Sequence, residues 1–200
     1  MRRTMGRSAR MGLALAVAAA CVALDQWTKA LALGNLVPGR PMTLVPGVMD
    51  LLLVRNTGAA FSIGEGAGWV FVLVCLVVCA AVAVALWRAR DVPVPLVVCA
   101  GLVMGGGVGN LIDRVTRGWV CDFFATTFVD FAVFNVADIF VCTGVGLGIV
   151  LTLVWDARRA REGEAKDGRA ARSVARGDTE GTGGRSAADR LRGKGGGRRG

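Results

Sequence analysis

Gly-Asn-Leu-Ile-Asp-Arg at 109–114, Cys-Asp-Phe at 121–123 and Phe-Asn-Val-Ala-Asp at 134–138 are three polar motifs beside two apolar runs. Those runs approach the length that a helix needs to span a membrane. Ionisable side chains are costly inside a bilayer, so they are candidates for a functional site. We predict that Asp122 and Asp138 form a two-carboxylate catalytic centre at the edge of a membrane.

The composition is that of a polytopic membrane protein. Hydrophobic residues make up 54% of the 200 residues, and the formal net charge of +9 is concentrated near the two ends. Four apolar runs are each long enough to be a membrane-spanning helix. We predict spans at about 11–34, 68–87, 96–112 and 136–155.

The first apolar run also has features of a secretory signal peptide. Four arginines precede it, and small residues surround Cys21 near its middle. A basic segment followed by an apolar segment and small residues is typical of such peptides. The helical pattern, however, continues to Leu33, and more spans follow, so we interpret 11–34 as a transmembrane helix.

The chain contains no histidine, which excludes Ser-His-Asp and Cys-His catalysis and any histidine-ligated metal. Most of the six cysteines lie in apolar runs, where a thiol behaves as a small hydrophobic group. Cys75 and Cys79 share a helix face, but one pair of thiols is a poor metal site. We therefore predict packing cysteines, no disulfide framework, no metal and no cofactor.

Residues 35–67 differ in character from the spans around them. Prolines and glycines break the helical pattern there, and 42–45 and 48–54 are typical of short strands. Asn56 begins an Asn-Thr-Gly sequence among small residues. This sequence is either an ordinary turn or a place where Asn56 holds the backbone of a substrate.

The distribution of charge predicts the topology. Residues 1–10, the 88–91 loop and the chain from Asp156 onward carry excess positive charge, whereas 35–67 and 113–135 do not. Under the positive-inside rule both termini are then cytoplasmic and both polar loops are extracytoplasmic. We divide the chain into a basic cytoplasmic N-terminus (1–10), a membrane domain (11–156) and a basic, disordered cytoplasmic tail (157–200).

The basic tail has two readings. Positive charge beside a membrane fits contact with anionic lipids. Nucleic-acid binding is the alternative, but the tail lacks aromatic residues and any recognised module, so we expect no nucleic acid.

Helical spacing brings several polar residues together. Asn110, Asp113 and Arg114 share one face at the outer end of the third span, and Asn135 lies one turn before Asp138. Asp25 and Lys29 are also one turn apart in the first span. Their spacing permits an internal ion pair that supports a polar site, or an aspartate at the membrane surface with a snorkelling lysine.

Two adjacent carboxyl groups can catalyse hydrolysis without a covalent intermediate. One of them keeps its proton, because both cannot ionise easily, and the ionised one can accept a proton from water. Two other classes of membrane protein remain open at this point. A transporter could use Asp25, Lys29, Asp113 and Asp138, and a non-enzymatic assembly protein could use the glycine-rich third span.

Five motifs occur here in the order seen in bacterial lipoprotein signal peptidase (signal peptidase II), and the chain resembles that family over about residues 11–156. The motifs are Asp25-Gln-Trp-Thr-Lys29, Asn56-Thr-Gly-Ala-Ala-Phe61, Gly109-Asn-Leu-Ile-Asp-Arg114, Asp122-Phe123 and Phe134-Asn-Val-Ala-Asp138. The resemblance implies a hydrolase of the bacterial inner membrane, an aspartyl protease that cleaves prolipoprotein signal peptides before a diacylglyceryl-modified cysteine.

The resemblance also implies a role for each matched residue and a fold. The implied catalytic pair is Asp122 and Asp138; the substrate-binding and site-ordering residues are Asn56, Asn110, Arg114 and Asn135; structural support comes from Asp25, Lys29, Asp113 and Gly109. The implied fold is mainly α, with four transmembrane helices, a small extracytoplasmic β-cradle at 36–60 and a mobile segment at 123–134. Cys121 and the short 123–134 segment depart from the family pattern.

Overall fold

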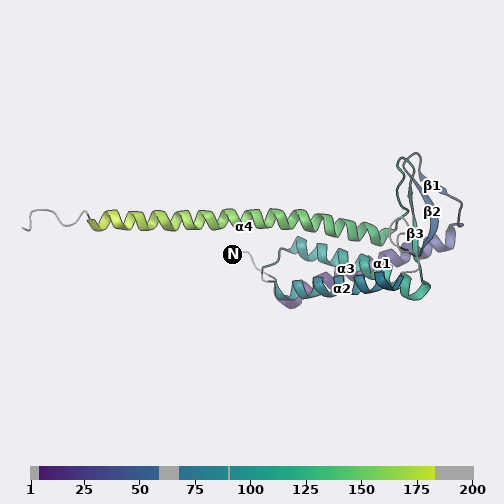
Figure 1. The fold of residues 1–200 in the computed structure, drawn as a ribbon, viewed down its shortest axis with the longest axis horizontal. Coiled ribbons are helices and arrows are strands. Elements are labelled where there is room, and N and C mark those ends of the chain that lie inside the picture. The colour runs from purple at the N-terminus through teal and green to yellow at the C-terminus, as the bar shows by residue number, and fades with distance from the viewer. Residues whose placement is uncertain (1–4, 59–67, 90, 183–200) are drawn as a thin grey trace, which may run out of the picture. The chain divides into compact units, whose positions relative to one another are not determined.

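The computed structural model of the chain describes residues 5–58, 68–89 and 91–182. The helices are α1 (Arg7–Asn35), α2 (Gly68–Arg88), α3 (Val94–Arg117) and α4 (Val136–Thr182). The strands are β1 (Met42–Val45), β2 (Met49–Asn56) and β3 (Val120–Thr126) (Figure 1). The last residues of the predicted β-cradle, and the rest of the loop to residue 67, lie outside the described residues.

Within the described residues, four helices are long and apolar enough to cross a membrane. They comprise Arg7–Asn35, Gly68–Arg88, Val94–Arg117 and Val136–Ala165. The four predicted spans fall on these helices, and together with the small sheet they confirm the predicted fold class.

Helix α3 packs closely against α1 because glycines line the contact. A Cβ atom added at Gly105 would lie 2.6 Å from the Cβ of Cys21 and 2.8 Å from the carbonyl oxygen of Ala18. One added at Gly109 would lie 2.5 Å from Oδ2 of Asp25. A side chain at either position would therefore push the helices apart, and at Gly109 it would push on a carboxylate of the polar site.

Helix α3 extends beyond the predicted end of the third span at 112. It ends at Arg117, where the left-handed Gly118 (φ 78°) donates its N–H to the carbonyl oxygen of Arg114. A glycine adopts this conformation without steric cost and commonly ends a helix. Asp113 and Arg114 thus lie on one helix with Asn110, as their spacing predicted, and the polar loop that we placed at 113–135 begins only after Arg117.

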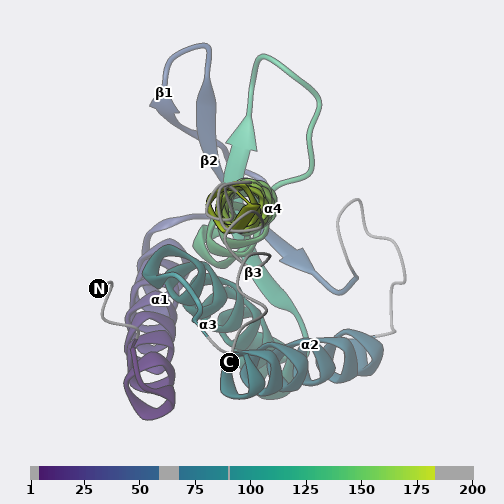
Figure 2. The same cartoon turned by 90° about the vertical axis from the view of Figure 1, so that its left-hand side faces the viewer.

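The three strands form one antiparallel sheet in the order β1-β2-β3, and Figure 2 shows it beside the ends of the helices. Strands β1 and β2 correspond to the predicted strands. Strand β3 was not predicted, since we assigned residues 113–135 to a polar loop and 123–134 within it to a mobile segment. It pairs with β2, so that Val54 lies opposite Asp122. This pairing places Asp122 close to the end of β2, where Asn56 lies.

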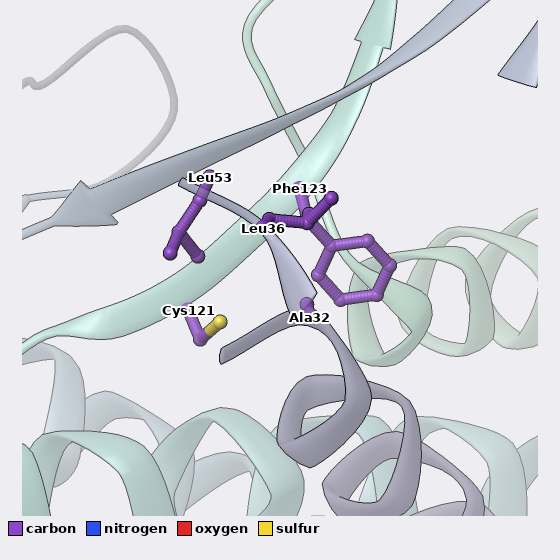
Figure 3. Packing of buried hydrophobic residues seen from close by; sticks show 5 residues of the cluster. All are labelled: Ala32, Leu36, Leu53, Cys121 and Phe123. Carbon is purple, nitrogen blue, oxygen red and sulfur yellow. The ribbon is translucent and has the colours of Figure 1, made fainter. Parts of the chain in front are cut away.

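A small apolar cluster fastens the sheet to the end of α1. It consists of Ala32, Leu36, Leu53, Cys121 and Phe123, all buried (Figure 3). Alternate residues of a strand point to opposite faces. Cys121 and Phe123 therefore face this cluster while Asp122 between them faces the other way, toward the polar motifs of α3 and α4.

The chain beyond residue 156 differs from the prediction of a disordered tail. Helix α4 continues to Thr182, and the second of two structural units begins at Leu153. Alanine, arginine and glutamate are frequent between 157 and 182 and favour helix, which explains the difference. Residues 183–200 lie outside the described residues.

Candidate active site

Asp122 on β3 and Asp138 in the first turn of α4 meet at Asn135. The Nδ2 of Asn135 donates to Oδ1 of Asp122 at 2.6 Å, and its backbone N–H donates to Oδ2 of Asp138 at 3.0 Å. Asp122 is only 2% exposed, and Asp138 is partly buried. The structure thus brings the two predicted catalytic carboxyl groups to one asparagine.

The Asn135-Val-Ala-Asp138 motif is a capping box at the start of α4. The backbone N–H of Asp138 donates to Oδ1 of Asn135 at 3.1 Å, and the backbone N–H of Asn135 donates back to the Asp138 carboxylate. Such reciprocal bonds satisfy N–H groups that have no partner inside the helix. The spacing of the motif therefore fixes the Asp138 side chain to the helix end.

Each of the four oxygens of the two carboxyl groups accepts a hydrogen bond from an asparagine. Asn56 donates to Oδ2 of Asp122 at 2.9 Å, and Asn110 donates to Oδ1 of Asp138 at 2.8 Å. The two bonds of Asn135 complete the set. Asn56 can present only its NH2 group to Asp122, because its Oδ1 accepts the N–H of Gly58 at 2.9 Å. The three predicted site-ordering asparagines thus all contact the carboxyl pair.

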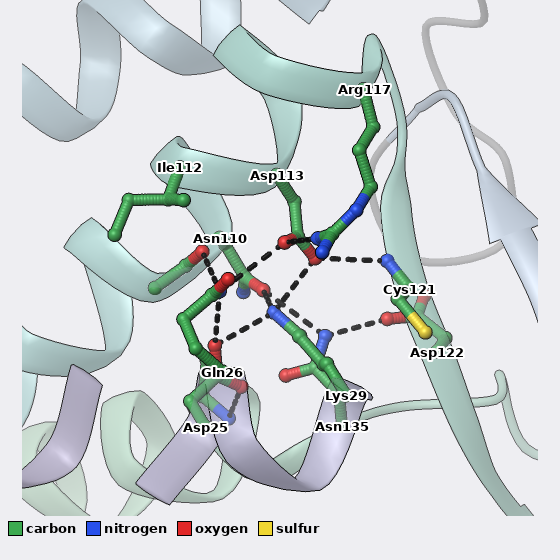
Figure 4. A network of polar contacts seen from close by, with 12 residues as sticks. Asp25, Gln26, Lys29, Asn110, Ile112, Asp113, Arg117, Cys121, Asp122 and Asn135 are labelled. Carbon is green, nitrogen blue, oxygen red and sulfur yellow. Dashed lines mark hydrogen bonds and ion pairs between the residues drawn. The ribbon is translucent and has the colours of Figure 1, made fainter. Parts of the chain in front are cut away.

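A buried ion cluster lies behind the carboxyl pair. Lys29 is fully buried, and its Nζ lies 2.9 Å from Oδ2 of Asp25 and 3.0 Å from Oδ2 of Asp113 (Figure 4). It also donates to Oδ1 of Asn110 at 2.9 Å. An ammonium group has three protons to donate, and these three acceptors engage all of them. Because Lys29 holds the Oδ1 of Asn110, the NH2 group of Asn110 faces Asp138.

The two supporting aspartates hold the backbone next to the carboxyl pair. Asp25 accepts the N–H of Ala137 at 3.0 Å, and Asp113 accepts the N–H of Cys121 at 3.1 Å. Ala137 directly precedes Asp138, and Cys121 directly precedes Asp122. The support expected of Asp25, Lys29 and Asp113 thus has a geometric form, since the cluster fixes the chain one residue before each carboxyl group.

Sequence reasoning missed two residues of this cluster, Gln26 and Arg117. The Nε2 of Gln26 lies 3.1 Å from Oδ2 of Asp25, 3.1 Å from the carbonyl oxygen of Gly109 and 3.2 Å from Oδ1 of Asp113. Arg117 forms an ion pair with Asp113. Gln26 is a polar residue inside an apolar run, and that was the available signal.

Arg114, in the last turn of α3, connects the carboxyl pair to the turn that follows β2. Its Nη2 donates to the carbonyl oxygen of Gly58 at 3.0 Å, and its guanidinium lies 5.1 Å from the ring centre of Phe71. It interacts electrostatically with both Asp122 and Asp138. Arg114 therefore places a positive charge near both carboxyl groups and links them to the Asn56 turn.

The pKa of Asp122 is raised to about 6. Burial is the largest cause, and the negative charge of Asp138 acts in the same direction. The hydrogen bonds from Asn56 and Asn135 act in the opposite direction, because they stabilise the ionised form. Asp122 can thus hold a proton close to neutral pH, as one member of a carboxyl pair that carries out acid–base chemistry must.

We predict that Asn56→Ala raises the pKa of Asp122 and that Asp138→Asn lowers it. The first change removes a donor to the ionised form, and the second removes a nearby negative charge. One bond to a charged group corresponds to about one pH unit in the titration midpoint. Carboxyl-labelled aspartate in NMR or infrared titrations measures the midpoint, with Asn35→Ala as a control at the exposed end of α1. Midpoints that move in the same direction in both variants contradict the assigned causes.

Comparison with known proteins identifies the family of this chain. The sequence model of the family described as Signal peptidase (SPase) II matches residues 17–154. The lipoprotein signal peptidase of Enterococcus faecalis is 36% identical over 148 residues, covering 74% of this chain and 91% of the relative. The lipoprotein signal peptidase of Leifsonia xyli is 40% identical over 159 residues, and the match covers 74% of this chain and 72% of the relative.

A solved bacterial membrane enzyme, determined by the in meso method, has the same fold. The two structures align with a TM-score of 0.67 and 29% sequence identity. The alignment covers 73% of this chain and 90% of the solved one. The family resemblance, the peptidase class and the membrane fold that the sequence predicted are thereby confirmed. The chain belongs to the signal peptidase II family and is a multi-pass membrane peptidase of the aspartic type.

Proposed function

We propose that this protein is an intramembrane endopeptidase that removes signal peptides from prolipoproteins by cleaving before the diacylglyceryl-modified cysteine. The observation that carries the proposal is the pair formed by Asp122 and Asp138, whose four oxygens each accept an asparagine N–H at the ends of candidate membrane helices. Family membership supports the substrate class, since the relatives are lipoprotein signal peptidases.

In the proposed reaction a water molecule lies between the two carboxyl groups. Ionised Asp138 accepts a proton from the water as its oxygen attacks the scissile carbonyl carbon. Asp122, whose pKa burial raises, donates its proton to the carbonyl oxygen. When the tetrahedral intermediate collapses, the C–N bond breaks and the leaving amine takes up the proton held by Asp138. The C=O bond forms again as a hydroxyl of the intermediate returns its proton to Asp122. Neither carboxyl group forms a bond to the substrate.

The ordering residues have distinct tasks in this reaction. Asn56, Asn110 and Asn135 keep the carboxyl oxygens oriented before the substrate arrives, which lowers the reorganisation that the reaction requires. Arg114 offsets negative charge on the pair. The buried cluster of Asp25, Lys29 and Asp113 keeps the backbone beside both carboxyl groups in place.

The location follows from the distribution of charge. We place both termini in the cytoplasm and the carboxyl pair on the extracytoplasmic side of the bacterial inner membrane, because basic residues dominate residues 1–10 and the chain after Asp156. The partners are diacylglyceryl-modified prolipoproteins and membrane lipids, and the diacylglyceryl group lies between spans. A site at the membrane edge suits a substrate that is anchored in the bilayer.

The test is cleavage of a diacylglyceryl-modified prolipoprotein peptide by the purified protein in detergent with EDTA present. We expect one cut, so that mass spectrometry finds a product beginning with the lipid-modified cysteine. The same peptide without the lipid is the control and should be cleaved at least about tenfold more slowly, because it loses the binding energy of two acyl chains. Equal cleavage of both peptides, or a cut at another bond, contradicts the proposal.

A further inference from the structure

Arg10 is a buried arginine in the first turn of α1, far from the carboxyl pair. The residue is 3% exposed. Asp25, which belongs to the polar cluster behind the carboxyl pair, lies 15 residues further along the same helix, or about 22 Å along its axis. Arg10 therefore takes no part in the peptidase site, and its burial needs another explanation.

The guanidinium of Arg10 makes one hydrogen bond within the described residues. Its Nη2 donates to the carbonyl oxygen of Ala89 at 2.8 Å. Ala89 directly follows α2, and a carbonyl at the end of a helix has no partner inside that helix. The bond joins the start of α1 to the end of α2, beside an apolar cluster formed by Ala14, Leu86 and Val97.

The other two nitrogens of the guanidinium have no hydrogen-bond partner among the described residues. Nε is the one buried side-chain nitrogen or oxygen of those residues that lacks a partner. Nη1 also lacks a partner but is not enclosed in the same way, so an anion can reach it from outside. The guanidinium thus has donors to spare and an open edge.

The positive charge of Arg10 has no counter-charge among the described residues. Their ion pairs all involve Asp25 or Asp113 and none includes Arg10. Asp91, the nearest carboxylate in the sequence, is exposed. A guanidinium stays protonated in a protein, and a buried charge without a partner is unfavourable. An anion from outside the chain would remove this cost.

Two helix N-termini add to the positive potential at this end of the helices. The N-cap residues are Gly6 for α1 and Pro93 for α3, and neither forms a side-chain cap. Neither helix has an acidic residue in its first turn. Because a helix N-terminus carries partial positive charge, both favour an anion. Arg7 and Arg88, both exposed, lie at the same end.

We propose that Arg10 binds the phosphate group of an anionic phospholipid. Guanidinium and phosphate form strong, charge-assisted hydrogen bonds. Arg10 lies in the first turn of a candidate membrane span, Arg7–Asn35, and the ends of such spans lie at the level of the lipid headgroups. A lipid phosphate is held at that depth by its own acyl chains. The site is independent of the reaction that the carboxyl pair performs.

The test measures the melting temperature of the purified protein in detergent with added lipid. Phosphatidylglycerol should raise that of the wild type by at least about 3 °C, because a ligand that binds only the folded state stabilises it. Phosphatidylcholine, whose choline already balances its phosphate, should raise it clearly less. Equal effects of the two lipids overturn the anionic ligand. Inorganic phosphate that matches phosphatidylglycerol overturns the lipid as its source.

Two substitutions locate the phosphate. Arg10→Met should lower the affinity for phosphatidylglycerol at least about tenfold in lipid titrations followed by native mass spectrometry. Arg7→Met removes the same charge from an exposed position one turn earlier and should retain the affinity within about threefold. If both variants weaken binding equally, the lipid responds to the net charge of this end, and the site at Arg10 is overturned.

The same variants separate lipid binding from a purely structural contact with Ala89. If Arg10 serves only to hold the end of α2, a folded Arg10→Met variant would respond to phosphatidylglycerol as the wild type does, and the proposal would be wrong. Melting without lipid verifies the fold. The comparison of lipids on the wild type needs no variant, so it tests the proposal even if Arg10→Met does not fold.

Discussion

Asp122→Asn and Asp138→Asn each reduce cleavage of the lipid-modified peptide by at least about a thousandfold. A positioned acid or base contributes about 10²–10⁴ to a rate, and in the proposed mechanism the two carboxyl groups act on one water molecule and one carbonyl group. Each variant retains the size of the side chain but cannot exchange a proton with the substrate. Initial rates at saturating peptide measure the effect.

The structure also predicts what these variants do to the fold. An amide at position 138 would place an NH2 group against Asn110 or against the backbone N–H of Asn135, both of which are donors. A modest loss of stability is therefore expected beside the loss of activity. Asp130→Asn, at an exposed position after β3, is the matched control and should cleave at the wild-type rate. Rates within about tenfold of wild type in either site variant would sink the catalytic assignment.

Lys29→Met lowers the free energy of unfolding by about 3–5 kcal/mol, because it leaves buried carboxylates without their cation. The side chains of Lys29, Asp25 and Asp113 are all fully buried in this cluster. Arg117 still pairs with Asp113, so Asp25 is the group most affected. Thermal or denaturant unfolding in detergent measures the loss, with Arg88→Met at the exposed end of α2 as the control.

A second variant separates the ion pair from other effects of the substitution. Asp25→Asn combined with Lys29→Met removes one of the carboxylates that Lys29→Met leaves unpaired. The double variant should therefore be more stable than Lys29→Met alone. A double variant in which the two losses simply add would show that Asp25 and Lys29 do not stabilise each other.

The sequence was sufficient for the spans and for the expectation that Asp122 and Asp138 lie together. Apolar length and charge bias act over many residues, so 11–34, 68–87, 96–112 and 136–155 could be recognised without tertiary information. Asn135 and Asp138 follow a local rule, since a capping box requires just this spacing. Such features depend on neighbours in the chain and can be predicted from it.

The rest depends on contacts between distant segments. Strand β3 was missed because its pairing with β2 joins residues on the two sides of α2 and α3, and Asp122 interrupts its apolar pattern. Gln26 has a role only because α3 brings Gly109 and Asp113 next to it. The helix beyond 156 was missed because its charged composition gave no sign of a packed core, although alanine and arginine favour helix without one.

The carboxyl pair is assembled from nearly the whole length of the membrane domain. Asn56 comes from β2, Asn110 from α3, Asp122 from β3 and Asp138 from the first turn of α4. A nascent chain that ends after α3 contains neither aspartate, and one that ends after β3 contains Asp122 but not Asp138. Under the proposed mechanism the order of synthesis therefore keeps the chain inactive until the start of α4 has been made, so a half-made chain cannot cut its neighbours in the membrane.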